Sequence, residues 1–281
     1  INRVRVIKKA DGYHVQFCFD AERKEEGVYT GNIVGLDLGL KYFTKDQNDN
    51  AVIYPQFFRK SEGRIKKRSK RLSKKFVKGK KPQSINYHKA RKRLGKVHLK
   101  IQRQRKDWAI KQARCVVASN DVVVYEDLKI ANMVSQRVGR VSRLEATGEP
   151  VRVKNHHLAK SISDASWYQF TQWLDYYGKI WDKAVLAVTP AYTSQDCSHC
   201  GHRAKKSLST RTHSCSSCGI EICRDTNAAI NILKKGMKIL GVEWQNNSTQ
   251  GHWESASKDG KHGEKTTNTI DGKPDIASGF L

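Results

Sequence analysis

Five of the seven cysteines fall between residues 197 and 223, and four of them have the spacing of a metal site. Two residues separate Cys197 from Cys200, two separate Cys215 from Cys218, and fourteen lie between the pairs. This double pattern predicts a closed tetrahedral Zn²⁺ site of four thiolates with a structural role. Disulfide bonds are the alternative interpretation, and they are uncommon in intracellular proteins that bind nucleic acids.

The other cysteines and the nearby histidines are weaker ligand candidates. These weaker candidates are Cys223, His199, His202 and His213. Gly201 and Gly219 each follow a cysteine pair, which permits the tight turn that directs backbone N–H groups at the sulfurs. We expect Cys18 and Cys115 to be buried as small apolar side chains.

Three carboxylates stand where catalytic acids could lie, and Asp37 is the first. The apolar stretch 33–38 reads as a strand, in which alternation places Asp37 on one face with Gly35 and Gly39. Because glycine has no side chain, we expect space above Asp37 for an ion or a sugar-phosphate backbone. The alternative is an aspartate of an ordinary turn.

Glu126 and Asp225 are the second and third carboxylates. Glu126 follows the run of valines at 122–124 at the end of a predicted strand, where it could simply face water. Asp225 precedes a predicted helix at 226–236, where it could serve as an N-cap. None of the three residues establishes a catalytic site by itself.

The charge of the chain is concentrated in one segment. The formal net charge is +26, and residues 59–114 hold 24 lysines and arginines against Glu62 and Asp107 alone, a local net charge of +22. Such a segment favours a phosphate backbone as its partner over an ordinary solvated helix face, which usually mixes both signs. The candidate nucleic-acid contacts are Arg64, Lys67, Arg68, Arg71, Lys74, Lys75, Arg91, Arg93 and Arg103.

Apolar residues recur through the same segment at helical spacing, on both sides of a loop at 77–84. This pattern predicts a helical hairpin with a narrow apolar seam and a wide cationic face. The seam residues are Ile65, Leu72, Phe76, Leu94, Val97, Ile101, Trp108 and Cys115.

The rest of the chain has the pattern of an α/β protein. We expect a β-hairpin at 2–19 turned by Asp11 and Gly12, strands at 32–55, 121–128 and 184–190, and one helix at 161–183. The aromatic residues of that helix are expected to be core. From residue 244 onward the composition predicts a disordered tail. No apolar run is long enough to span a membrane, and nothing predicts an oligomeric state.

Five motifs together resemble one protein family. "GLDLGLKYF", "VVVYEDLKIANM", "HLAKSISDASW", "PAYTSQDCSHCG" and "CRDTNAAINIL" are similar, in this order, to the TnpB (OrfB) proteins of bacterial insertion sequences, relatives of type V CRISPR effector nucleases. The resemblance implies an α/β RNase H-like (RuvC) mixed sheet with flanking helices, a basic hairpin insertion and an inserted zinc ribbon. It also implies an RNA-guided DNA endonuclease of the bacterial cytoplasm, nucleoid-associated, with guide RNA and target DNA as partners.

The resemblance also assigns segments and site residues. Residues 1–31 would be the remnant of an N-terminal β wedge domain, and 244–281 a tail. The nuclease would occupy 32–192 and 221–243, with the zinc ribbon at 193–220. Asp37, Glu126 and Asp225 would form the catalytic trio.

Metal dependence follows from gathering these acids, because neighbouring carboxylates repel one another unless cations lie between them. Mg²⁺ or Mn²⁺ suits such oxygen ligands, and two ions would allow phosphodiester hydrolysis. We hypothesise that Asp37 bridges both ions while Glu126 and Asp225 each hold one. The alternatives are a strand-transferring transposase and a non-catalytic zinc-ribbon protein that binds nucleic acid.

Overall fold

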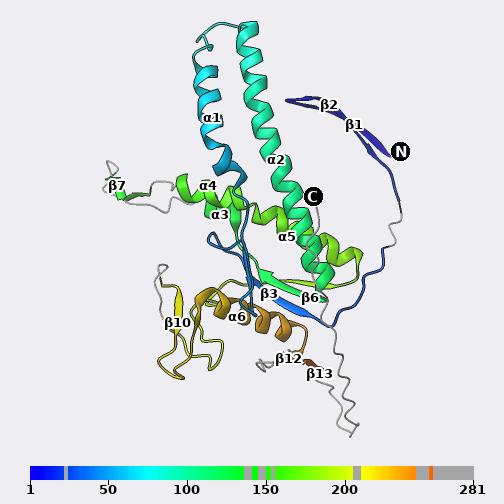
Figure 1. Cartoon of the computed structure of the whole chain (residues 1–281), viewed down its shortest axis with the longest axis vertical. Helices are drawn as coiled ribbons and strands as arrows, with labels where there is room; N and C mark the ends of the chain where they lie inside the picture. Colours follow the sequence, from blue (N-terminus) through cyan, green and yellow to red (C-terminus); the bar gives the residue numbers. More distant parts are fainter. Residues whose placement is uncertain are drawn as a thin grey trace.

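A mixed five-stranded sheet forms the centre of the protein (Figure 1). The computed structural model describes residues 1–21, 25–135, 141–144, 150–152, 156–204, 210–244 and 253–255. The strand order is β5-β4-β3-β6-β9, with β3, β6 and β9 parallel and β4 and β5 antiparallel additions at one edge. The strands are β3 Ile33–Asp37, β4 Thr44–Asp46, β5 Ala51–Val52, β6 Val122–Glu126 and β9 Ala184–Val188. The expected α/β class with a mixed sheet is confirmed.

Helices cover both faces of this sheet, because the parallel strands carry apolar side chains on both faces. The helices are α2 Ile85–Ser119, α5 Trp167–Ile180 and α6 Arg224–Ile239. Val34 and Leu36 of β3 share one apolar core with residues of α2 and α5. Val124 of β6 packs with Ile232 and Leu233 of α6 on the other face. The sheet therefore lies between two helical layers.

Helix α6 approaches the sheet so closely that two glycines are required. A Cβ added to Gly35 would lie 2.4 Å from the carbonyl oxygen of Ala229 and 2.7 Å from Cβ of Leu233. A Cβ added to Gly236 would lie 2.3 Å from a methyl group of Val124. Helix α6 therefore fills the space beside Gly35, so this glycine serves helix packing, while the expected space above Asp37 stays a prediction.

The basic segment forms the expected helical hairpin, which extends away from the sheet (Figure 1). Helix α1 spans Phe57–Ser73 and packs against α2 through Ile65, Val97 and Ile101. Helix α2 continues to Ser119, past the expected end at 114, and its last turns enter the core beside the sheet. Phe76 lies beyond α1 and is exposed, so it does not belong to the seam.

A buried aspartate fixes the base of the hairpin. The side chain of Asp164 is fully buried and accepts hydrogen bonds from the backbone N–H groups of Phe58 and Arg59 at 2.9 and 3.1 Å. Arg105 of α2 donates to it from Nε and Nη2, at 3.0 and 2.8 Å. One carboxylate thus holds the start of α1, the middle of α2 and helix α4 (His156–Ala165) together. Such a buried charge is tolerated because backbone N–H groups and a guanidinium donate to its oxygens.

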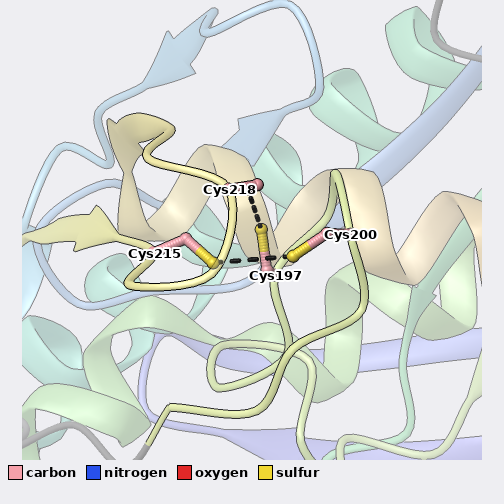
Figure 2. A group of neighbouring side chains, drawn as sticks. All are labelled: Cys197, Cys200, Cys215 and Cys218. Atoms are coloured by element: carbon pink, nitrogen blue, oxygen red, sulfur yellow. Dashed lines mark hydrogen bonds between the residues drawn. The ribbon is translucent and has the colours of Figure 1, made fainter.

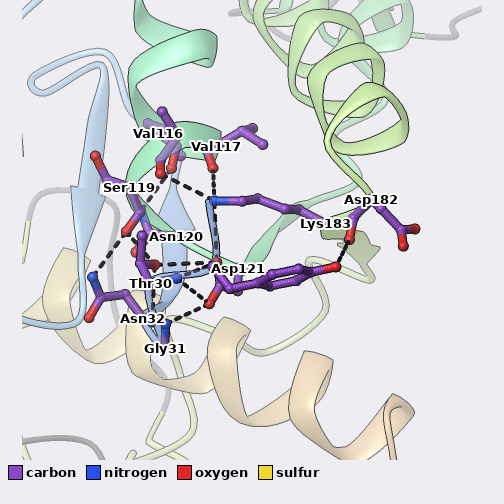
Figure 3. Close-up of polar contacts among 12 residues, drawn as sticks. Thr30, Gly31, Asn32, Val116, Val117, Ser119, Asn120, Asp121, Asp182 and Lys183 are labelled. Carbon is purple, nitrogen blue, oxygen red and sulfur yellow. Dashed lines mark hydrogen bonds and ion pairs between the residues drawn. The ribbon is translucent and has the colours of Figure 1, made fainter. Parts of the chain in front are cut away.

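A second polar cluster fixes the amino ends of the parallel strands, opposite the catalytic candidates (Figure 3). Asp121 accepts hydrogen bonds from the N–H groups of Thr30 and Gly31 at 2.8 and 2.6 Å. Buried Lys183 pairs with Asp121 at 3.2 Å and donates to the carbonyl of Val117 at the end of α2. Burial opposes ionisation of Asp121, but these N–H groups and Lys183 lower its pKa.

Two helices, α4 and α5, stand where a single helix was expected at 161–183. Helix α4 ends at Ala165 and α5 begins at Trp167, with Ser166 between them in the left-handed conformation at φ 60°. The short helix α3, Ile130–Ser135, was not expected. The aromatic and aliphatic residues of α5 are buried as expected, namely Trp167, Phe170, Leu174, Tyr177 and, just after it, Trp181.

Four small strand pairs lie outside the sheet. They are β1 Arg3–Lys9 with β2 Gly12–Cys18, β7 Val141–Leu144 with β8 Pro150–Arg152, β10 Thr212–Ser214 with β11 Glu221–Cys223, and β12 Val242–Trp244 with β13 Trp253–Ser255. The first confirms the expected hairpin, although Lys9 pairs with Gly12, so the turn is Ala10 and Asp11. The last contradicts disorder at 253–255, while the rest of the tail from 245 lies outside the described residues.

Cys18 and Cys115 are both exposed, so the expectation that they are buried is wrong. Cys18 ends an exposed strand, and Cys115 lies on the outer face of α2, beside the buried positions Ala113 and Val117. Among the helices in the described ranges, none combines the length and apolar character needed to cross a bilayer.

We predict that Gly35→Ala destabilises the protein by about 1–3 kcal/mol or more, because backbone atoms of α6 leave no room for a methyl group. The control is Gly63→Ala on exposed α1, where a Cβ meets no atom within 4 Å and should stabilise the helix by about 0.5–1 kcal/mol. Urea denaturation measures both changes. Equal effects of the two substitutions would contradict the close packing of α6.

Candidate active site and metal centre

Two of the three candidate acids lie at the carboxyl ends of neighbouring parallel strands. Asp37 is the last residue of β3 and Glu126 the last of β6. Asp225 comes from the first turn of α6, which packs on the same two strands. Burial raises the pKa of Asp37 well above its usual range, and the negative charges of Glu126 and Asp225 raise it further. The fold therefore brings the three acids into one electrostatic cluster.

Glu126 is buried and held by a neighbour that sequence reasoning missed. The hydroxyl of Thr193 donates to its carboxylate at 2.5 Å, and both residues are less than a tenth exposed. Burial raises the pKa of Glu126, while the hydrogen bond from Thr193 and the charge of Lys235 act in the opposite direction. Thr193 stands in the "PAYTSQDCSHCG" motif, four residues before Cys197, which was its only signal in the sequence.

Asp225 does not cap α6, contrary to the alternative that the sequence left open. The N-cap position belongs to Cys223, and Asp225 lies inside the first turn. Its carboxylate accepts from the guanidinium of Arg224 at 3.2 Å and lies 3.9 Å from that of Arg211. An acid near the positive end of a helix is favourably placed even without capping it.

Polar side chains along α6 hold the segment that leads into the cysteine cluster. Asn227 accepts from the N–H of Ser198 at 2.9 Å and donates to the carbonyl of Asp196 at 2.9 Å. Asn231, one turn later, donates to the carbonyls of Thr193 and Asp196 at 2.8 and 2.7 Å. The helix that supplies Asp225 therefore also positions Thr193, the partner of Glu126.

The start of α6 is tied to the sheet by a third set of contacts. Lys45, the cross-strand partner of Asp37, is buried, and its ammonium contacts Cys223 Sγ at 3.1 Å and Asp49 at 2.9 Å. The hydroxyl of Thr226 donates to the same carboxylate of Asp49. These contacts fix the position of Asp225 from the side of β4.

The four predicted zinc ligands converge (Figure 2). Cys197 Sγ lies 3.7 Å from Cys218 Sγ, and Cys200 Sγ lies 3.5 Å from Cys215 Sγ. All four sulfurs lie within 4.8 Å of one another, and none forms a disulfide. Sulfurs at roughly 2.3 Å from a tetrahedral Zn²⁺ would lie ~3.8 Å apart, so this geometry fits a four-thiolate zinc site.

The loops that carry the cysteines have the expected turns. Gly201 and Gly219 adopt φ of 76° and 74°, and their N–H groups donate to the carbonyls of Cys197 and Cys215 at 2.9 Å. Backbone N–H groups of Cys218 and Ser217 lower the pKa of Cys215, which favours the thiolate that binds metal, whereas burial and the neighbouring sulfurs raise the pKa of Cys218. In the described ranges, these four cysteines are the one set of three or more ligand side chains gathered within 4.8 Å.

The carboxylate trio is more widely spread than the cysteine cluster, since it does not meet that 4.8 Å limit. Its chemistry nevertheless fits a hard divalent cation, because the three carboxylates supply oxygen ligands and their mutual repulsion is what a cation relieves. Asp37, Glu126 and Asp225 would be the residues that hold it.

The basic candidates lie on the hairpin, and most of them face solvent. The exposed ones are Arg64, Lys67, Arg71, Lys74, Lys75, Arg91, Arg93 and Arg103. Arg68 is half-buried and donates to the carbonyl of Arg93 at 2.7 Å, so it braces the two helices. Arg103 forms an ion pair with Asp11 of the β1–β2 hairpin at 2.7 Å. These two arginines therefore have structural partners.

Two family models match the chain. The model described as "Probable transposase" (OrfB_IS605) matches residues 16–137, and "Cas12f1-like, TNB domain" matches residues 167–232. Solved structures with low similarity include the "Cas12f1-sgRNA-target DNA complex", at 17% identity and TM-score 0.39, covering 82% of this chain and 55% of that one. "CRISPR-Cas_phi3" has 14% identity and TM-score 0.41, covering 71% and 44%.

Curated relatives share more sequence. "Putative RNA-guided DNA endonuclease InsQ" of Escherichia coli K12 is 32% identical over 243 residues, which are 85% of this chain and 58% of the relative. A "Putative RNA-guided DNA endonuclease" of Streptomyces pristinaespiralis is 30% identical over 206 residues, covering 73% and 45%. The chain thus spans about half the length of these relatives. With both family models and both relatives in agreement, the chain belongs to the TnpB/OrfB family of insertion-sequence proteins.

Proposed function

We propose that this chain carries the nuclease portion of an RNA-guided DNA endonuclease encoded by an insertion sequence. Its sheet would be an RNase H-like (RuvC) core, and its reaction the metal-dependent hydrolysis of DNA phosphodiesters. Guide RNA and target DNA would be its partners, in keeping with the names of the curated relatives.

One observation carries this proposal: three carboxylates from distant parts of the chain meet at one edge of the sheet. Asp37 lies close enough to Glu126 and Asp225 for their charges to raise its pKa. A purely structural cluster of this kind is unfavourable, because each buried carboxylate loses hydration and repels the others. Such strain is typical of sites that bind a metal ion.

Mg²⁺ or Mn²⁺ held by these acids would activate water as a nucleophile and stabilise the leaving oxygen. The protein itself supplies orientation. Thr193 fixes the carboxylate of Glu126, and the contacts of Lys45 and Asn227 fix the first turn of α6. Glu126 and Asp225 would thus be held in place before substrate arrives, which lowers the cost of assembling the site.

We propose that Zn²⁺ in the four-cysteine site has a structural role. Four thiolates leave no open coordination position for a substrate. The segment that begins the ribbon contacts α6 through Asn227, Asn231 and Lys234, whose ammonium donates to the carbonyl of Ser198 at 2.5 Å. The zinc site would therefore stabilise the same helix that presents Asp225.

The α1–α2 hairpin would hold the nucleic-acid backbone. Its exposed lysines and arginines lie on a support that Asp164 and Arg105 anchor to the nuclease core. When lysine and arginine side chains on this rigid hairpin bind phosphates, they release the counterions of the nucleic acid, and the protein backbone does not have to become ordered first.

We predict that Asp37→Asn reduces metal-dependent cleavage by more than the roughly 10–100-fold that a change beside a metal ligand costs, while nucleic-acid affinity is retained. The carboxyl of Asp37 has a raised pKa, so the folded protein loses stability as the pH rises through that pKa. In buffer at pH 8 without added Mg²⁺ or chelator, Asp37→Asn should therefore raise the melting temperature. Cleavage assays with Mg²⁺, filter binding and calorimetry measure the three quantities.

Retention of cleavage by Asp37→Asn would contradict the assignment of this residue. Joined DNA ends in place of cut ends would indicate strand transfer, and unaltered DNA with every divalent ion tested would indicate a binding protein.

Cys200→Ser should lower both bound zinc and the melting temperature, because three thiolates hold the metal less tightly and α6 loses support. The control is Cys115→Ser, which removes an exposed thiol outside the cluster and should change neither. Atomic absorption and thermal denaturation provide the measurements. If Cys200→Ser abolished cleavage with zinc content and melting unchanged, the structural role would be wrong.

Lys67→Gln and Lys74→Gln should each weaken binding and reduce the slope of log affinity against log salt by about 0.9 for duplex DNA or 0.7 for single strands. Lys238→Gln removes an exposed charge at the far end of α6 and serves as the charge-matched control. Binding by the unmodified protein that did not vary with salt would exclude the hairpin as a phosphate-binding surface.

A further inference from the structure

A cavity of about 350 Å³ opens beside Glu126, on the side of the sheet opposite α6. Leu38, which follows Asp37, and Glu126 both line it, so it adjoins the ends of the two strands that carry catalytic candidates. Its volume is near the lower end of the roughly 300–1,000 Å³ that small-ligand pockets occupy. One nucleotide unit could enter such a cavity, whereas a duplex could not.

One stripe of helix α5 forms a wall of this cavity. Tyr168, Thr171, Gln172 and Asp175 all line it, and their spacing of three, four and seven residues places them on one helix face. The opposite face of α5 is the buried core face described above. The spacing of aromatic residues in the sequence indicated only the core face of α5. It gave no sign that the other face lines a cavity.

The lining combines an aromatic ring, apolar side chains and polar groups. Tyr168 lies in the first turn of α5, and 60% of its surface is exposed, whereas Tyr177 on the core face of the same helix is buried. Leu128 and Ile130 supply apolar surface, and Thr171 and Gln172 supply hydrogen-bonding groups. This combination is typical of sites where an unstacked base rests on an aromatic ring.

The charge of the lining disfavours a phosphate as the occupant. Asp127 and Asp175 contribute acidic side chains, and Lys129, the one lysine of the lining, pairs with Asp127 at 2.6 Å. Asp175 also accepts a hydrogen bond from the hydroxyl of Tyr125 at 3.0 Å. An anionic cavity repels a phosphate, while a neutral base that carries N–H groups meets acceptors there.

We infer that this cavity binds an unstacked nucleobase of the DNA strand that the site cuts, with Tyr168 as its stacking platform. The inference rests on the proposed nuclease function and adds a contact that positions the nucleotide next to the cut. A base held there orients its own phosphate toward Glu126 and Asp37. Binding of the base, at a distance from the reacting atoms, would in this way align the phosphate for reaction.

Fluorescence of 2-aminopurine tests the base contact without any cleavage. The probe is a single-stranded oligo-dT with one 2-aminopurine, bound to the Asp37→Asn protein in buffer without added Mg²⁺ or chelator, at saturating protein concentration. Stacking on Tyr168 should quench the base, Tyr168→Ala should abolish that quench, and Tyr168→Phe should restore it. A quench that is unchanged in Tyr168→Ala would overturn the inference.

Cleavage of a guide-matched target with an abasic site beside the cut tests the consequence. Tyr168→Ala should lower kcat/KM by about ten-fold on intact DNA and cause no further loss on abasic DNA, because both changes remove the same contact. Tyr176→Ala, an exposed tyrosine of α5 outside the cavity lining, is the control that keeps the normal ratio between the two substrates. Equal losses from Tyr168→Ala on both substrates would overturn the inference.

The two experiments separate failure of the cavity from failure of the proposed function. A Tyr168-dependent quench in a protein that cuts no DNA would support the base site and contradict the nuclease. Cleavage without a Tyr168-dependent quench would support the nuclease and contradict the base site.

Discussion

The close contact between helix α6 and the sheet is the constraint on which the rest of the site depends. Gly35 and Gly236 allow the helix backbone to approach β3 and β6 to a distance that any side chain would prevent. That approach brings Asp225 to the strand ends that carry Asp37 and Glu126. Because the same helix holds the segment before the cysteines through Asn227 and Asn231, the cysteine cluster and the acids share one support.

The cost of this arrangement is electrostatic, and the surrounding contacts offset it. Burial and mutual repulsion raise the pKa of Asp37, so the metal-free cluster works against folding. Two buried carboxylates elsewhere have cationic partners: Asp121 pairs with Lys183 at the opposite end of the sheet, and Asp164 pairs with Arg105 at the base of the hairpin. A site under repulsion is tolerated when the scaffold around it is firmly fixed.

Sequence patterns predicted the local elements well and their partners poorly. Alternation and periodicity located β3, β6, the basic hairpin and the core face of α5, because each pattern reports the environment of its own residues. The break at Ser166 was missed, since apolar spacing continues through it. Thr193 was missed because its role exists only through contact with Glu126, 67 residues away in the chain.

The sequence by itself determined the four cysteines that converge, the acids that could form a trio and the location of the positive charge, because residue type and spacing specify ligand chemistry and net charge. Only the tertiary structure decided what surrounds them. It showed that α6 occupies the space beside Gly35 and that one face of α5 lines a cavity. It also showed that Asp225, in the first turn of α6, lies beside the guanidinium groups of Arg211 and Arg224. These outcomes depend on how layers pack against one another, and packing joins residues whose separation along the chain leaves no periodic signal.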